Sequence, residues 1–168
     1  ELFSLCYMQS EKGDVVEIGS WQGKSTFYLG TAVKYSGNGS MIAIDHFNGN
    51  KGREHLYRVN KDDLSDLRET FTNNMTRMGL TEIKLFDMKS ARARAKLNKH
   101  RIRFLFIDGD HSYEGVKGDI ELFKDLLVPG ALVVFDDYSK RGFPGVVKAV
   151  GEFCEGNERV SRTYKLGR

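Results

Sequence analysis

The sequence predicts an α/β protein with a Rossmann-like, doubly wound and mostly parallel sheet that carries helices on both faces. Short apolar runs of strand length alternate with longer segments in which apolar residues recur every three or four positions. Glycine residues and the Pro129-Gly130 pair mark several of the turns between these segments. Alternation of this kind is typical of a parallel sheet covered by helices on both sides.

Size and composition set the limits of the interpretation. The chain has 168 residues and 40% hydrophobic content, which suits one ordinary domain with a core, so we expect residues 1–168 to form a single domain. A net charge of +3 is too small to indicate a nucleic-acid or membrane partner. Two cysteines do not make a disulfide scaffold, and no apolar stretch approaches the roughly 18 residues that span a bilayer. We therefore expect a cytoplasmic protein.

The first half of the chain predicts a leading helix, three strands and two further helices. Leu2, Leu5 and Cys6 have helical spacing, and Gly13 ends this segment. The strands are expected at residues 15–18, 41–44 and 83–86, and the helices at 25–37 and 64–79. Residues 46–61 show no apolar period, and a polar loop of that length is usually functional, so we expect a lid there.

The second half predicts two strands, with a sixth after them, and helices in between. The strands are expected at residues 104–107 and 131–135, with a further one at 160–165, and the helices at 116–127 and 146–153. Pro129-Gly130 predicts a turn before the fifth strand. The basic segment from Lys89 to Arg103 covers a short helix, and we interpret it as a solvated surface.

Each of the first five strands ends in an acidic residue. These residues are Glu17, Asp45, Asp87, Asp108 and Asp136. Because parallel strands end at one edge of the sheet, and open α/β sheets bind ligands there, we expect a site at this edge.

The loop after the first strand, Glu17-Ile-Gly-Ser-Trp-Gln-Gly-Lys-Ser25, limits the kind of ligand. A Walker-type phosphate loop needs four residues between its first Gly and the Gly-Lys-Ser, and three are present here. A dinucleotide fingerprint needs Gly where this chain has Trp21 and Lys24. The remaining pattern is Glu-x-Gly-x-x-x-Gly. Its acid, Glu17, can reach an ammonium group of a ligand. Gly19 allows a sharp turn, and Gly23 lies where a side chain would meet the ligand. A ligand with an amino acid and a nucleoside, but no phosphate, fits best.

Two later strand ends extend this ligand site. Asp45, at the end of the second strand, can accept hydrogen bonds from both hydroxyls of a ribose. Asp87 or Ser90, after the third strand, could flank an adenine, or Ser90 could be an ordinary helix cap. Tyr113 and His46 are weaker candidates for substrate or adenine contacts.

These motifs resemble those of class I S-adenosylmethionine-dependent methyltransferases over nearly the whole chain. Ile107-Asp-Gly-Asp-His-Ser-Tyr-Glu-Gly115, Leu127-Val-Pro-Gly130 and Asp136-Asp-Tyr138 most resemble the metal-dependent branch with macrocin-type sugar O-methyltransferases and cephalosporin-hydroxylase-like proteins. The likeness to catechol-type enzymes is looser. The resemblance implies that S-adenosyl-L-methionine binds at Glu17, Gly19, Ser20, Gly23, Ser25, Asp45, His46, Asp87, Ser90 and Asp108. The family also adds a final antiparallel strand that this sequence lacks, so we expect truncation or a partner at the sheet edge.

The acidic cluster after the fourth and fifth strands suggests a metal. Mg²⁺ is held by one to three carboxylates, with water or substrate oxygens completing the shell. Asp108, Asp136 and Asp137 suit this role, and the resembling family binds Mg²⁺ or another divalent cation at the matching acids. The plainer alternative is that Asp110 and Asp136 cap a helix and a turn. Beside a metal-bound hydroxyl, His111 could act as the general base.

The sequence as a whole therefore predicts an S-adenosylmethionine-dependent, divalent-metal-dependent O-methyltransferase acting on a small hydroxylated acceptor. A non-catalytic accessory domain that only binds S-adenosylmethionine is the alternative, followed by a nucleotide triphosphatase. We expect no membrane or nucleic-acid partner, and a homo-oligomer stays open.

Overall fold

The computed structural model describes residues 1–49, 66–155 and 160. Its strands are β1 (Asp14–Ile18), β2 (Met41–Asp45), β3 (Lys84–Asp87), β4 (Ile102–Ile107) and β5 (Leu127–Phe135). Its helices are α1 (Leu2–Met8), α2 (Lys24–Ser36), α4 (Leu67–Arg77), α5 (Ser90–Lys96), α6 (Tyr113–Phe123) and α7 (Pro144–Glu155), with a 3₁₀ turn, η2 (Lys124–Leu126), after α6. The expected lid and sixth strand fall almost wholly on residues 50–65 and 161–168, outside the described residues.

The five strands form one parallel sheet in the order β3-β2-β1-β4-β5. The chain moves outward from β1 to β3 and then crosses over to β4 on the other side of β1. The predicted doubly wound, Rossmann-like fold is confirmed. The topological switch point lies between β1 and β4, where folds of this type open a ligand crevice.

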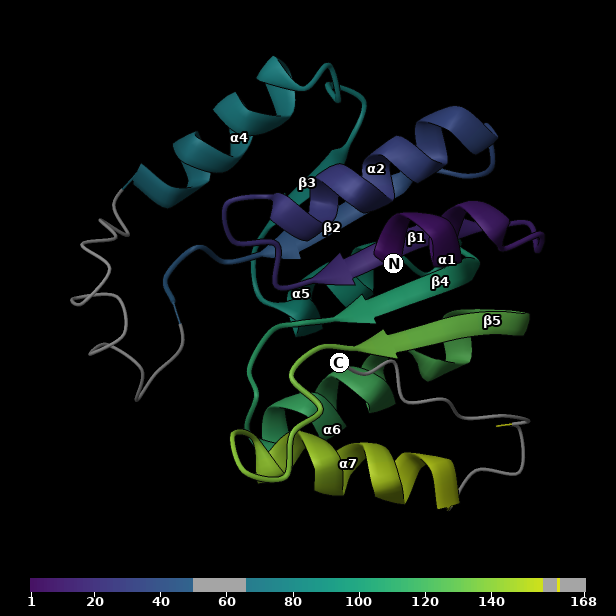
Figure 1. The fold of residues 1–168 in the computed structure, drawn as a ribbon, viewed down its shortest axis with the longest axis vertical. Coiled ribbons are helices and arrows are strands. Elements are labelled where there is room, and N and C mark those ends of the chain that lie inside the picture. Colours follow the sequence, from purple (N-terminus) through teal and green to yellow (C-terminus); the bar gives the residue numbers. More distant parts are fainter. Residues whose placement is uncertain (50–65, 156–159, 161–168) are drawn as a thin grey trace.

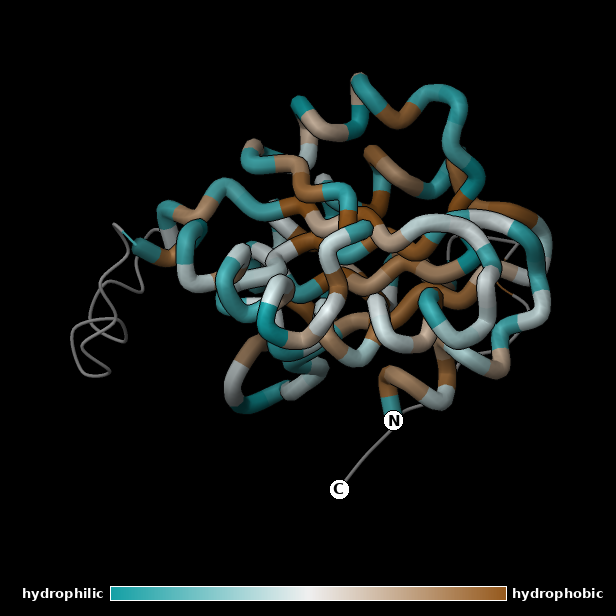
Figure 2. Tube along the Cα trace, turned by 90° about the horizontal axis from the view of Figure 1, so that it is seen from above, coloured by the Kyte–Doolittle hydropathy of each residue, from teal (hydrophilic) through white to brown (hydrophobic). Residues whose placement is uncertain are grey.

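Helices cover both faces of the sheet (Figure 1). On one face the residues of α5, α6 and α7 pack against Val16, Ile44, Leu105 and Ile107. On the other face α1 and α2 pack against Val15, Phe104 and Phe106, while α4 packs over Ala43 and Leu85. Apolar segments accordingly gather along the strands in the middle of the molecule, with hydrophilic ones outside (Figure 2). None of the described helices is long and apolar enough to cross a membrane.

The last strand and the helix before it differ from the prediction. The helix expected to reach Leu127 ends at Phe123, and β5 begins at Leu127 and runs straight through Pro129-Gly130. Proline lacks an amide hydrogen and is tolerated on a strand at the sheet edge, where β5 lies among the described strands. The pairing register shifts between Ile102 and Phe104, opposite this segment, so the Pro-Gly pair is an irregularity within the strand.

A buried arginine fixes α1 onto the sheet. Arg103 is 0% exposed, although the sequence places it in a basic segment interpreted as solvated. Its guanidinium donates to the backbone carbonyls of Cys6 (2.8 Å), Gly13 (3.1 Å) and Asn38 (3.1 Å). These charge-assisted hydrogen bonds offset the free-energy cost of burying the guanidinium charge. Because α1 forms one wall of the site described below, Arg103 helps to position that wall.

Candidate functional site

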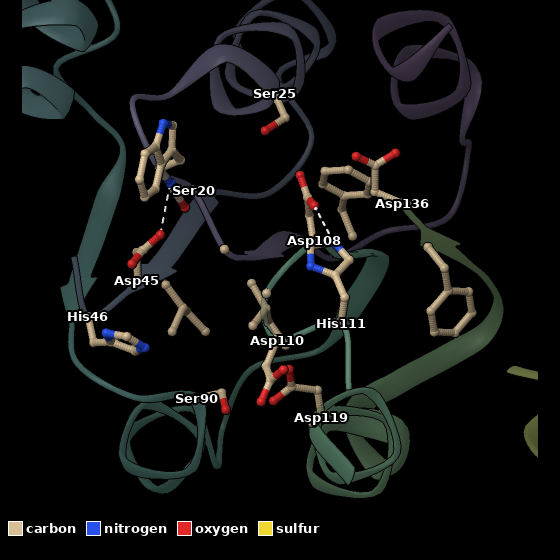
Figure 3. A pocket seen from close by; sticks show the side chains of 18 of the residues that line it. Ser20, Ser25, Asp45, His46, Ser90, Asp108, Asp110, His111, Asp119 and Asp136 are labelled. Atoms are coloured by element: carbon tan, nitrogen blue, oxygen red, sulfur yellow. Dashed lines mark hydrogen bonds and ion pairs between the residues drawn. The ribbon is translucent and has the colours of Figure 1, made fainter. Parts of the chain in front are cut away.

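A cavity of about 1210 Å³ opens at the carboxyl edge of the sheet. It is lined by the loops that follow the strands and by residues of α1, α2 and α6. Polar side chains converge on it from the strand-end loops and from α2, α5 and α6 (Figure 3). Its position above the β1/β4 switch point is the one expected for ligand binding in an open α/β sheet.

The loop between β1 and α2 passes unusually close to the end of β4. Gly19 has a φ of +88°, and a Cβ atom there would lie 2.1 Å from the carbonyl oxygen of Asp108. Gly23 also has a positive φ, +90°, but a Cβ atom there would meet Met75 and Phe71 of α4. In this structure α4 occupies the space beside Gly23, and the expected contact between Gly23 and a ligand stays a prediction.

Glu17 lies beneath this loop. Its side chain is 0% exposed and does not line the cavity, and its Oε2 accepts a hydrogen bond from the Thr26 hydroxyl. Burial raises its pKa to about 7, an effect that the neighbouring hydroxyl groups of Ser25, Thr26 and Ser20 oppose. Within the described residues its Oε1 has no hydrogen-bond partner by geometry. The carboxyl thus supports the loop from below, and any contact with an ammonium group remains a prediction.

Asp45 holds two loops at the edge of the cavity. One carboxylate oxygen accepts the backbone N–H of Trp21 (2.8 Å) and the other accepts that of Phe47 (2.7 Å). Each oxygen keeps a further lone pair that a ribose hydroxyl could use. The carboxylate of Asp45 lines the cavity, in the place predicted for it.

Of the residues predicted to contact an adenine or the substrate, some line the cavity and others do not. His46 and Ser90 line the cavity beyond Asp45, whereas Asp87 does not. Asp87 instead pairs with Arg68 at 2.8 Å, and both side chains are largely exposed. Tyr113 also lies outside the cavity, because its hydroxyl donates to Glu152 on α7 (2.7 Å).

His111 lies between two carboxylates just beyond β4. Its Nε2 is 3.2 Å from Asp108 Oδ1 and 3.3 Å from Asp137 Oδ2, and its ring packs on Phe143 with centroids 4.9 Å apart. Its Nδ1 is buried without a hydrogen-bond partner among the described residues. The atom of the imidazole that faces polar groups is therefore Nε2.

The acids around His111 differ in environment. Burial, with the like charges of Asp136 and Asp137, raises the pKa of Asp108 to about 6, although a hydrogen bond from His111 opposes the shift. Asp137 adopts a left-handed backbone with a φ of +54°, which aspartate tolerates better than most residues. Asp110 accepts the backbone N–H of Ser112 (2.9 Å), and Ser112 itself caps α6. The predicted structural role of Asp110 is close to this, but the cap residue is Ser112.

The three proposed metal ligands are not arranged as a coordination site among the described residues. Asp108 and Asp136 line the cavity, and Asp137 reaches His111 from the end of β5. Within residues 1–49, 66–155 and 160, no three His, Cys, Asp or Glu side chains lie close enough together to hold a metal ion. The carboxylates share a neighbourhood, and their role as metal ligands stays a prediction.

Sequence reasoning missed the apolar wall of the site. Leu2 and Leu5 of α1, Tyr28 of α2, Phe106 of β4 and Val134 of β5 line the cavity, and Val134 lies two residues before Asp136. The helical spacing of α1 predicts an apolar face but does not say what it covers. Only the packing of α1 over the ends of β4 and β5 turns that face toward the cavity.

Two solved structures that have the same fold as this chain are described as methyltransferases. CalS11, a calicheamicin methyltransferase, superposes with a TM-score of 0.71 at 18% identity over 99% of this chain and 74% of its own. The O-methyltransferase TomG from Streptomyces achromogenes, solved in complex with S-adenosylmethionine, gives a TM-score of 0.67 at 16% identity over 94% of this chain and 67% of its own. At such identities the likeness shows the fold.

A sequence relative and a family model match parts of the chain directly. An uncharacterized protein of Acanthamoeba polyphaga mimivirus is 44% identical over 52 residues, which are 30% of this chain and 24% of that protein. The match thus spans about a quarter of the viral protein's length. The model of a methyltransferase domain matches residues 16–138, which include the ends of all five strands and the loops that line the cavity. The chain therefore belongs to this family of methyltransferase domains.

Proposed function

We propose that the chain is an S-adenosylmethionine-dependent O-methyltransferase that acts on a small hydroxylated acceptor with a divalent cation. The observation that carries the proposal is the single cavity that joins Asp45 to Asp108 and His111. A carboxylate suited to a ribose lies at one side of this cavity, and an imidazole suited to proton transfer lies at the other. Membership of the methyltransferase-domain family supports the same reaction class.

The cofactor half of the site runs along β1 and β2. Gly19 lets the loop after β1 approach the end of β4, and Ser20 and Ser25 line the cavity from that loop and the start of α2. Asp45 would bind the ribose with the lone pairs that Trp21 and Phe47 leave free. Bound S-adenosylmethionine would supply an electrophilic methyl group, so this chain's task is to place the acceptor oxygen in line with it.

His111 is the proposed base. An acceptor hydroxyl that enters beside Asp108 lies within reach of Nε2, which can take its proton in the neutral tautomer that carries its hydrogen on Nδ1; the resulting N–H can then donate to Asp108. The two carboxylates beside Nε2 would then stabilise the positive charge of the imidazolium that forms. Phe143 packs against the ring and restricts its orientation.

The donor set fits a divalent cation. Asp108, Asp136 and Asp137 offer the hard oxygen ligands that Mg²⁺ prefers. A cation would also relieve their mutual repulsion, which adds to the effect of burial in raising the pKa of Asp108. Such an ion would supply charge that lowers the pKa of the acceptor hydroxyl. Side-chain movement would have to bring the three acids together, since they are not yet arranged as ligands.

The acceptor class follows from the wall beside Asp136. An apolar surface next to carboxylates suits a ring that carries hydroxyl groups, and sugars, phenols and small polyols all have this character. CalS11, which has the same fold, is described as a TDP-rhamnose 3′-O-methyltransferase. A sugar hydroxyl is therefore the first acceptor class to test.

Replacing His111 tests the proposal. Isothermal titration should show that wild type and His111→Ala bind S-adenosylhomocysteine with similar affinity, while methyl transfer to an acceptor found in a sugar, phenol and polyol panel falls on the order of 10²-fold or more. His100→Ala is the matched control, because His100 pairs with Asp14 at the opposite end of β1. Transfer in that variant should be unchanged.

Three results would change the proposal. Full turnover in His111→Ala would remove this residue from the mechanism. Cofactor binding without transfer to any acceptor, with or without Mg²⁺, would favour the non-catalytic accessory domain. Transfer that withstands a chelating agent would remove the cation from the proposal and leave the methyltransferase.

A further inference from the structure

Helix α4 supports the cofactor half of the site from outside the cavity. Phe71 and Met75 of this helix belong to one apolar cluster with Phe47, which follows β2. The rings of Phe71 and Phe47 have centroids 5.7 Å apart. Trp21, in the loop after β1, packs against the same cluster. The loops after β1 and β2 therefore both rest on α4, a helix that has no role in the mechanism proposed so far.

The loop after β1 has a backbone conformation that depends on such support. Gly19, Trp21 and Gly23 have φ values of +88°, +49° and +90°. A residue with a side chain rarely adopts a positive φ unless contacts hold it there. Asp45 supplies one contact, since its carboxylate accepts the N–H of Trp21 at 2.8 Å. This bond fixes the first part of the loop, and the second part has other partners.

The peptide group between Gln22 and Gly23 is held at both ends. Asn74 of α4 donates from Nδ2 to the carbonyl oxygen of Gln22 at 2.9 Å. The N–H of Gly23 donates to the carbonyl oxygen of Ser20 at 2.8 Å. Because the C=O and N–H of one peptide group are fixed in a plane and point in opposite directions, the two bonds together set its orientation.

Gly23 allows α4 to approach the loop closely enough for this contact. A Cβ atom on Gly23 would lie 2.5 Å from Cε of Met75 and 3.2 Å from the ring of Phe71. Phe71, Asn74 and Met75 have the i, i+3, i+4 spacing of one helix face, so the same face that packs on Gly23 presents the Asn74 amide. Asn74 itself does not line the cavity. Residues on either side of the held peptide group do, namely Ser20, Trp21, Lys24 and Ser25.

We propose that Asn74 is a positioning residue for cofactor binding, because its hydrogen bond to Gln22 holds the loop after β1 in the conformation that binds S-adenosylmethionine. This inference rests on the proposed function, since it needs the cofactor to bind at this loop. Without the bond the loop populates other conformations, and the apparent affinity falls with the population of the binding conformation. Proton transfer takes place beside His111, away from α4, so turnover with saturating cofactor does not depend on the bond.

A purely structural role for Asn74 makes a different prediction. If its amide only joins α4 to the loop, its replacement lowers the melting temperature, but the folded chain still binds the cofactor as the wild type does. Titration well below the melting temperature measures the affinity of the folded chain. This affinity therefore separates the two roles.

Two substitutions test the proposal. Asn74→Leu removes the donor at similar size, and Asn74→Asp replaces it with an acceptor that repels the Gln22 carbonyl. Isothermal titration with S-adenosylhomocysteine should show a Kd raised on the order of tenfold in both variants. The KM for S-adenosylmethionine should rise while kcat stays unchanged. Asn73→Leu and Asn73→Asp are matched controls, because Asn73 is the exposed neighbour on the same helix, and both should bind as the wild type does.

The outcomes separate this inference from the function on which it rests. Failure of the wild-type chain to bind S-adenosylhomocysteine overturns the proposed function and the inference with it. Binding by the wild type, with unchanged affinity in the folded Asn74 variants, overturns the inference alone. A further measurement needs no variant: in the ligand-free wild-type chain the amide hydrogen of Gly23 should be protected from hydrogen exchange. Protection that appears only after S-adenosylhomocysteine is added also overturns the inference, because the ligand and not α4 would then order the loop.

Discussion

Asp45 shows how a single side chain can hold the backbone of two loops. Trp21 and Phe47, which donate their N–H groups to its two oxygens, have φ values of +49° and +53°. A bulky residue in the left-handed region costs roughly 1–2 kcal/mol. The two hydrogen bonds to the carboxylate offset part of this cost. Asp45 therefore stabilises the walls of the cofactor site as well as offering a place for a ribose.

Replacing Asp45 with Asn should accordingly affect both stability and binding. An amide has one oxygen, so one of the two backbone N–H groups would face an NH₂ group and lose its partner, at a cost of about 1–3 kcal/mol. Thermal unfolding should then occur several degrees lower, and titration should show weaker S-adenosylhomocysteine binding. Asp87→Asn is the control, because its exposed pair with Arg68 contributes little. Equal melting temperatures for the two variants would contradict this role of Asp45.

Residues at strand ends could be found from the sequence, and buried ones could not. Asp45 and Asp108 were predicted because each follows an apolar run directly, and His111 because it lies three residues beyond Asp108; the parallel sheet brings such strand ends together. Asp119 has no such signal, since its environment comes from the packing of α6 against α5. The full burial of Glu17 likewise depends on α2 covering the end of β1.

At the scale of elements, the close approach of β1 and β4 builds the centre of the site. Gly19 N donates to Ile44 O (2.9 Å) and Asp108 N donates to Ile18 O (2.8 Å), so backbone bonds join the ends of β2, β1 and β4. The absence of a side chain at residue 19 allows the Asp108 carbonyl to lie directly beside the loop. The position of His111 depends on this contact, because it follows β4 by only a few residues.

A methyl group at residue 19 should disrupt this arrangement. In Gly19→Ala the new Cβ would lie 2.1 Å from the Asp108 carbonyl oxygen at a φ of +88°, so the strand ends must separate. Gly37→Ala is a matched control, because its φ is +61° and nothing lies within 4 Å of the new Cβ. The control should lose only about 1–2 kcal/mol of unfolding free energy in urea titrations. We expect a clearly larger loss for Gly19→Ala, and similar losses in the two variants would refute the close contact.

The elements themselves were largely predictable, and the exceptions have physical causes. Runs of Val, Ile and Phe buried on both sides identify β1, β2 and β4 as central strands. The predicted start of β5, residue 131, was too late because Pro-Gly usually ends a strand. β5 continues through Pro129-Gly130 because it lies at the edge of the sheet. The contact of α4 with Gly23 could not be foreseen, because periodicity shows which face of a helix is apolar but not which loop it covers.

At the scale of the whole molecule, buried and partly buried acids gather at and beneath the site. Glu17, Asp108 and Asp119 belong to three different elements, and burial is the main cause of a raised pKa in each. Asp108 and Asp119 line the cavity, which therefore favours cationic or hydrogen-bond-donating ligands, because these partners stabilise the ionised form of each acid. The sulfonium and amino groups of the proposed cofactor have this character.

The same acids should make the stability of the ligand-free chain depend on pH. The pKa of Glu17 rises from 4.5 to about 7, so between these values the folded chain binds more protons than the unfolded chain. Its contribution to stability is complete below pH 4.5 and is lost as the pH rises toward 7, by at most about 1.4 kcal/mol per pH unit. Glu17→Gln cannot ionise, so urea titrations from pH 4.5 to 7 should show the variant gaining stability relative to wild type as the pH rises. A difference between the two proteins that stays constant across this range would show that Glu17 titrates normally in the folded chain.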